Sequence, residues 1–178
     1  MRFKKVGEID PDILQQNSQY IAGLMDGEGS FSIISNPKRL YFRPLLALAM
    51  NHEETIKFVA DKFGVDSKPI LRKRKSHVEG EAGTTAKTTY VTRVFVEDDI
   101  VKVLTTLLPS LITKKRQAQL ILEFIRTKQQ FSGTKARRDL LLKLGEIYVQ
   151  VRRLNPKGRR FDYDKWHKQF DEAIRRMQ

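Results

Sequence analysis

The stretch from Tyr20 to Phe31, YIAGLMDGEGSF, constrains the fold of this chain more than any other segment. It is an apolar segment with two adjacent small residues, Ala22 and Gly23, and it runs directly into an acidic, glycine-flanked turn, DGEG. Small residues allow another backbone to come close, and a glycine after an apolar segment is typical of a helix end. The stretch therefore predicts a closely packed helix that ends in a turn rich in carboxylate and carbonyl oxygens.

The charge of the chain indicates a polyanionic partner. Its 178 residues, enough for one domain, include 34 Lys and Arg against 21 Asp and Glu, which gives a net charge of +13. Such an excess is the electrostatic signature of a nucleic-acid-binding protein. A membrane is the less favoured partner, because no apolar stretch approaches the roughly 18 residues that a span needs.

The residue types that are missing exclude several kinds of site. The chain has no cysteine, which rules out disulfides and thiolate zinc sites, and its three histidines, His52, His77 and His167, lie far apart. The first residues are not followed by the apolar run of a signal peptide. We therefore expect an intracellular protein, without distinguishing the cytoplasm from an organelle.

Hydrophobic periodicity and turn residues predict an α+β fold in the order helix, two strands, helix, two strands, helix, helix, and then two further helices. We expect a core over residues 1–131 and a helical extension over residues 132–178 that packs on the same domain. The predicted strands are 30–35, 41–50, 68–75 and 89–96, with a long polar loop over 76–88. The predicted helices are 19–25, 53–63, 97–108, 113–130, 135–154 and 162–177.

The nine residues Ile21–Gly29, IAGLMDGEG, resemble the signature motif of the LAGLIDADG homing endonucleases position by position. The departures are Ile for Leu, Met for Ile, Gly for Ala, and Glu for the second Asp. The motif occurs once, so the chain resembles the single-motif, homodimeric subgroup, and the resemblance covers about residues 18–130. It implies an αββαββα fold with a curved antiparallel four-stranded sheet. The structural alternative is a helix end followed by an ordinary acidic turn.

The resemblance also implies a metal site. Glu28 would be the ligating carboxylate and the Gly27 carbonyl a second ligand, while Asp26 caps or positions backbone. Oxygen ligands and a helix C-terminus suit Mg²⁺, which activates water and stabilises charge in phosphodiester hydrolysis, and we expect Mn²⁺ to substitute.

Two further segments resemble active-site positions of the family. Lys114, in the segment LPSLITKKRQA, matches the active-site lysine, whose cation would stabilise negative charge on the reacting phosphate. Glu53, or alternatively Glu54, matches a water-organising residue, and Lys57 matches a basic active-site residue. The structural alternatives are a basic first turn of a solvated helix, an acidic helix cap and a surface lysine.

The antiparallel sheet is predicted to read double-stranded DNA, because such a ribbon fits the major groove. Arg72 and Arg74 are two residues apart and so share one face of their strand. Arginine reads guanine bidentately, whereas lysine mainly holds phosphate. The residues expected on the DNA-binding face and its tip are Ser32, Ile34, Asn36, Lys38, Arg39, Arg43, Arg72, Arg74, Val91 and Arg93.

These features together predict an Mg²⁺-dependent, sequence-specific DNA endonuclease. One motif per chain implies one scissile strand per chain, so cutting both strands of a long, near-palindromic target needs a homodimer. Its interface is expected at Ala22, Gly23 and Asp26. Two alternatives use the same scaffold, an RNA maturase for intron splicing and a non-cleaving DNA-binding protein. A structural RNA-binding protein explains the charge but gives the acidic motif no role.

Overall fold

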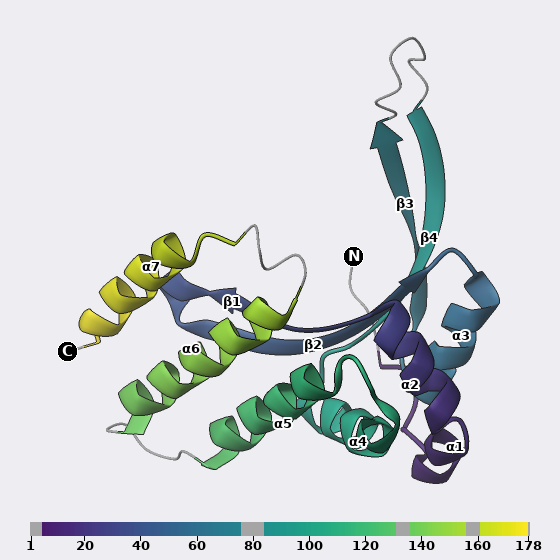
Figure 1. Ribbon diagram of the computed structural model, residues 1–178, viewed down its shortest axis with the longest axis horizontal. Helices are drawn as coiled ribbons and strands as arrows, with labels where there is room; N and C mark the ends of the chain where they lie inside the picture. Colours follow the sequence, from purple (N-terminus) through teal and green to yellow (C-terminus); the bar gives the residue numbers. More distant parts are fainter. Residues whose placement is uncertain (1–4, 76–83, 131–135, 156–160, 178) are drawn as a thin grey trace.

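The structure, a computed structural model, describes residues 5–75, 84–130, 136–155 and 161–177 (Figure 1). Its strands are β1 (Gly29–Asn36), β2 (Tyr41–Met50), β3 (Ser67–Lys75) and β4 (Thr84–Val94). Its helices are α1 (Pro11–Gln16), α2 (Ser18–Gly27), α3 (Glu53–Lys62), α4 (Glu97–Leu107), α5 (Lys115–Gln130), α6 (Ala136–Leu154) and α7 (Tyr163–Arg175), with short 3-10 turns η1 (Pro37–Arg39) and η2 (Leu108–Ser110). The predicted α+β class and element order are confirmed.

Two local features differ from the prediction. Helix α1 was not expected, although Pro11 begins it and the Asp10 carboxylate caps it by accepting hydrogen bonds from the amides of Asp12 and Ile13. Strand β4 begins at Thr84, five residues before the predicted start at Thr89. The rest of the predicted polar loop, residues 76–83, lies outside the described residues.

The four strands form one antiparallel sheet in the order β1-β2-β4-β3. Strand β1 pairs with β2 over its whole length, but β4 pairs with β2 only from Leu46 to Met50. Residues 41–45, the half of β2 next to η1, therefore have a neighbouring strand, β1, on one side only. We call this part the tip half of β2. Pro44 lies in that half, where a residue without an N–H group is tolerated.

Alternation along the strands gives the sheet one apolar face. Phe31, Ile33, Leu46, Leu48 and Val94 point into the core and are almost completely buried. In Figure 1, α4, α5 and α6 lie on one side of the β1–β2 ribbon, and the β3–β4 hairpin extends away from them. The face opposite the core is formed by the alternate residues of the same strands.

Helices α6 and α7 pack onto the tip half of β2 through an aromatic cluster. The Phe42 ring of β2 lies within 6.3 Å of the rings of Phe124, Tyr148, Trp166 and Phe170, measured between centroids. Trp166 and Phe170, both in α7, are stacked with their centroids 4.8 Å apart. The Trp166 indole also donates a hydrogen bond of 3.2 Å to the Ser35 hydroxyl of β1. The C-terminal helices thus share one core with the sheet.

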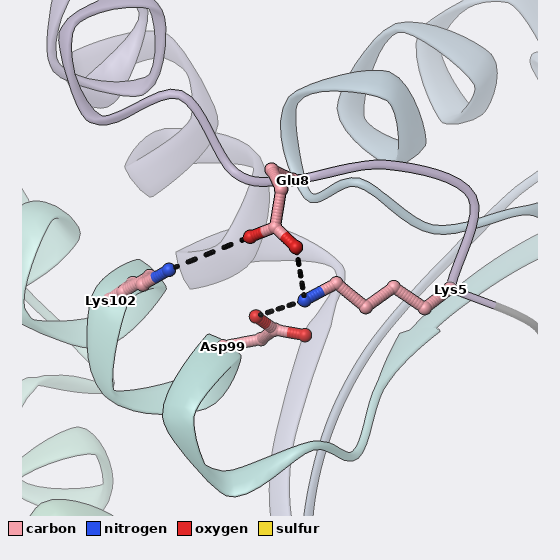
Figure 2. A network of polar contacts seen from close by, with 4 residues as sticks. All are labelled: Lys5, Glu8, Asp99 and Lys102. Carbon is pink, nitrogen blue, oxygen red and sulfur yellow. Dashed lines mark hydrogen bonds and ion pairs between the residues drawn. The ribbon is translucent and has the colours of Figure 1, made fainter.

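The segment before α1 is held by a polar network against α4 (Figure 2). The Lys5 ammonium donates to the Asp99 carboxylate at 3.1 Å and lies 3.5 Å from Glu8, which itself lies 3.9 Å from Lys102. Asp99 is only 2% exposed, so Lys5 compensates a buried negative charge. The same segment reaches Gly64, which must be glycine because its φ is +58° and a Cβ atom placed on it would lie 2.5 Å from the Gly7 carbonyl oxygen.

Replacing Trp166 with alanine should destabilise the whole domain, because the indole is buried at the junction of α7, α6 and the sheet. We expect the free energy of unfolding to fall by about 3–5 kcal/mol, measured by chemical denaturation. Lys168→Ala, an exposed position two residues along the same helix, should change it by less than about 0.5 kcal/mol. Equal, small effects of both substitutions would show that α7 does not fold cooperatively with the sheet.

Candidate active site

The acidic turn between α2 and β1 is the centre of the site. Helix α2 ends at Gly27 and β1 begins at Gly29, so Glu28 alone connects them. A Cβ atom on Gly29 would lie 2.5 Å from the Met25 carbonyl oxygen. The chain can therefore pass this closely over the last turn of α2 only with glycine at position 29. The Glu28 amide donates to the Leu24 carbonyl and closes the helix, while the Glu28 side chain is exposed. The turn therefore presents one carboxylate to solvent beside the last carbonyls of a helix.

Lys114 approaches those carbonyls from the segment before α5. Its ammonium donates to the carbonyl oxygens of Met25 at 2.8 Å, Asp26 at 2.5 Å and Gly27 at 3.4 Å. A cation is favoured there by the negative end of the helix dipole. Burial lowers the pKa of Lys114, whereas the carboxylates of Asp26 and Glu28 act in the opposite direction. The carbonyl oxygens at the end of α2 thus form a site that attracts a cation.

The Asp26 carboxylate makes the reciprocal contact with the start of α5. It accepts hydrogen bonds from the backbone amides of Ile112 at 2.6 Å, Thr113 at 3.3 Å and Lys114 at 2.9 Å. Burial raises the pKa of Asp26, but these hydrogen bonds outweigh it, so the pKa lies below its usual value. The Asp26 carboxylate therefore holds the segment before α5 within the same chain. This is the capping or backbone-positioning role that was expected for Asp26 from the sequence.

Glu53 and Lys57 form an ion pair at the start of α3. Their side chains are 2.7 Å apart, one helical turn from each other. Hydrogen bonds from Lys57 and then Tyr90 lower the pKa of Glu53, and Glu53 raises the pKa of both partners. Tyr90 was not among the residues indicated by the sequence, because its contact with Glu53 depends on the pairing of β4 with β2.

Strand pairing brings this ion pair to the same end of the sheet as the acidic turn. The first residue of β1, Gly29, pairs with Leu48, and β2 ends two residues later, at Met50. Helix α3 then starts at Glu53. The acidic turn and the start of α3 thus both adjoin the joined ends of β1 and β2.

The face of the sheet opposite the core carries most residues expected to meet DNA. Strand register places Ser32, Ile34, Arg43 and Arg93 on this face, and Ile34 is 49% exposed. The 3-10 turn η1 at the tip presents Lys38 and Arg39 to solvent, next to the exposed Asn36. In β3, Arg72 pairs with Lys87 and Arg74 with Thr85, so the two arginines occupy one face of the strand backbone.

Two of the expected residues are less accessible than the sequence suggested. Val91 lies by register on the side expected to bind DNA but is only 3% exposed, because β4 is an inner strand with Ala49 and Lys68 as cross-strand neighbours. Ala22 is 0% exposed, since this side of α2 packs into the core of its own chain. Gly23 is exposed instead, and a Cβ atom placed on it would meet nothing within 4 Å.

No group of three His, Asp or Glu side chains converges as a metal-ligand cluster within the described residues. A divalent cation would therefore depend on the Glu28 carboxylate together with main-chain oxygens such as that of Gly27. Such an all-oxygen donor set suits Mg²⁺. Within the same described ranges, no helix is long and apolar enough to cross a bilayer.

No protein-family profile and no curated protein sequence matches the chain. Solved structures do match it. The homing endonuclease I-CvuI, in complex with its DNA target in the presence of Ca, has a TM-score of 0.65 and 18% identity over 92% of this chain and 95% of its own.

Two further structures extend this comparison. The archaeal intron-encoded homing endonuclease I-Vdi141I, complexed with DNA, has a TM-score of 0.63 and 20% identity over 92% of this chain and 98% of its own. The LAGLIDADG homing endonuclease I-GzeII, in complex with its DNA target, has a TM-score of 0.55 and 16% identity, and it matches 93% of this chain but only 59% of its own. The chain has the fold of the LAGLIDADG homing endonucleases.

Proposed function

We propose that this protein is a sequence-specific DNA endonuclease that hydrolyses both strands of a near-palindromic target as a homodimer. The observation that carries the proposal is the turn after α2, where the exposed Glu28 carboxylate lies beside helix-end carbonyls and the Lys114 ammonium. DNA complexes of I-CvuI, I-Vdi141I and I-GzeII, which share the fold, support DNA as the substrate. A DNA target also implies an intracellular site of action.

The residues of the turn have distinct roles in this proposal. Glu28 and the Gly27 carbonyl would hold a divalent cation, Mg²⁺ or in its place Mn²⁺, which when bound would activate water and neutralise charge on the phosphate. The Lys114 ammonium, held by the carbonyls at the end of α2, adds positive charge beside the phosphate as negative charge develops there. Asp26 fixes the segment that carries Lys114.

The pair formed by Glu53 and Lys57 lies at the edge of this site. Glu53 is ionised at neutral pH, and its hydrogen bonds with Lys57 and Tyr90 lower its pKa further; it would accept a hydrogen bond from water beside the reacting phosphate. Lys57 adds positive charge one helical turn away, where the DNA backbone passes. Glu54 is exposed and takes no part in the ion pair.

The homodimer is supported by the exposed side of α2. Gly23 and Gly27 are four residues apart on one side of the helix, and Cβ atoms on either would meet nothing within 4 Å within the described chain. Two such helices can approach closely there. The length comparison agrees, because the chain spans nearly all of I-CvuI but 59% of I-GzeII, as expected if the longer protein joins two such units.

Glu28→Gln should reduce cleavage by at least about 100-fold and leave DNA binding nearly unchanged, because the amide keeps the shape but loses the charge that holds the cation. Binding is measured in Ca²⁺ and cleavage in Mg²⁺. Glu123→Gln, on the exposed side of α5, is the matched control and should cleave normally. Wild-type turnover by Glu28→Gln would remove this turn from the active site. Binding without cleavage by the wild type would favour the non-cleaving alternative.

Gly23→Leu should weaken the dimer and abolish double-strand cleavage, because a large side chain would separate the two α2 helices. Sedimentation of the free protein and of its DNA complex measures the association state. Gln119→Leu, an exposed change on α5, should leave the dimer intact. A monomeric wild type that cuts both strands at full rate would contradict the homodimer.

Asp26→Asn should destabilise the protein at neutral pH by weakening the cap of α5. Since the pKa of Asp26 is lower in the folded than in the unfolded state, its carboxylate stabilises the folded state fully above the unfolded value near 3.8. This contribution is lost as the pH falls through the lower, folded value. Denaturation midpoints of the two proteins should therefore differ most above pH 5, begin to approach each other near 3.8, and converge only as the pH falls through the lower, folded value. A difference that is constant with pH would show that the charge of Asp26 has no role.

A further inference from the structure

The guanidinium of Arg43 lies over an aromatic ring on the face of the sheet that points away from the core. Its central carbon is 4.3 Å from the centroid of the Phe95 ring. The last pair between β2 and β4 is Leu46 with Val94, so Phe95 directly follows the end of β4. Arg43 lies in the tip half of β2, which β4 does not reach. Phe95 therefore fills the corner where the sheet narrows from three neighbouring strands to two.

This contact leaves the hydrogen-bonding capacity of Arg43 free. A cation over an aromatic face is attracted by the ring electrons and uses no N–H donor. Arg43 forms no ion pair with a carboxylate among the described residues, and its side chain is half-buried, not fully covered. No side-chain hydrogen bond of Arg43 occurs within the described part of the chain either, so the N–H donors of its guanidinium are available there for a partner on the open face.

The chemistry that matches this arrangement is a guanine edge in the major groove. Arginine donates two parallel hydrogen bonds to the O6 and N7 atoms of guanine. An arginine that moves freely loses side-chain freedom when it binds, whereas one already held on a ring loses less. The neighbour of Arg43 across the β1–β2 ladder is Ile34, which offers only apolar surface. The Phe95 ring thus restrains the Arg43 side chain, and the cross-strand partner Ile34 provides no polar group that could do so.

We propose that Phe95 is a positioning residue for base recognition, which holds Arg43 so that its guanidinium reads one guanine in each half of the DNA target. The inference rests on the proposed function, since it requires sequence-specific binding of double-stranded DNA. It assigns Phe95 a role without direct contact between its ring and the DNA bases.

The test is a binding profile over a randomised DNA library for the full-length wild type, Arg43→Ala, Phe95→Leu, Phe95→Tyr and the double variant Arg43→Ala/Phe95→Leu. Arg43→Ala should relax the preference at one base pair per half-site by roughly 5- to 150-fold. Phe95→Leu should relax the preference at the same base pair by roughly 2- to 30-fold. Phe95→Tyr keeps an aromatic face and should keep the preference within about twofold of the wild type.

The double variant and a control separate positioning from a structural role. The double variant should be no less selective than Arg43→Ala, because Phe95 acts only through Arg43. Tyr41→Leu removes another exposed aromatic residue from the same face and should leave this base pair unaffected. Unchanged preference in Phe95→Leu, or a change at a different base pair, would overturn the proposal while the proposed function stands. A wild type that shows no preference for any DNA sequence would overturn both.

Discussion

The exchange of caps between α2 and α5 is the interaction on which the candidate site depends. Asp26 at the end of α2 binds the amides that precede α5, and Lys114 from that same segment binds the carbonyls that end α2. Each helix end thereby receives the charge that its dipole favours. The exchange joins positions 88 residues apart in the sequence and fixes the acidic turn relative to the lysine. Loss of the Asp26 carboxylate would release the segment before α5, and loss of the Lys114 ammonium would leave the carbonyls at the end of α2 without this cation.

The same exchange explains how a cation-binding group of oxygens survives in a protein with a net charge of +13. The helix orients the carbonyl groups at the end of α2. Glu28 is the single residue between α2 and β1, so the Glu28 carboxylate stays beside these carbonyls. Lys114 already binds there as a cation within the chain. In the proposed function, a metal ion would share this negative region with the lysine when a phosphate brings further negative charge. The surplus of positive charge elsewhere then serves to attract DNA.

The architecture was predictable from the sequence where a short-range pattern determines it. The period-two alternation of Phe42, Leu46 and Leu48 gave the core face of β2, and the glycines around Glu28 gave the end of α2. The positions of Glu28 and Lys114 came from resemblance to a known motif, and their catalytic roles stay predictions.

Features that depend on distant neighbours were not predictable in this way. The burial of Ala22 depends on which side of α2 meets the core, and that of Val91 on strand order, because an inner strand is covered from both sides. Tyr90 and Phe95 gained their contacts with Glu53 and Arg43 only through pairing of β4 with β2. The reciprocal capping of Asp26 and Lys114 likewise has no local sequence signal.

The measurement that tests the account most directly is cleavage of a plasmid library of randomised targets by the wild-type protein, in Mg²⁺ and in EDTA, with sequencing of the linear products. The account predicts breaks in both strands within one near-palindromic sequence family, in Mg²⁺ only. Cleavage that persists in EDTA would contradict a metal site at the acidic turn. Absence of cleavage in Mg²⁺ and in Mn²⁺, with the library bound, would contradict the assignment of this turn as an active site.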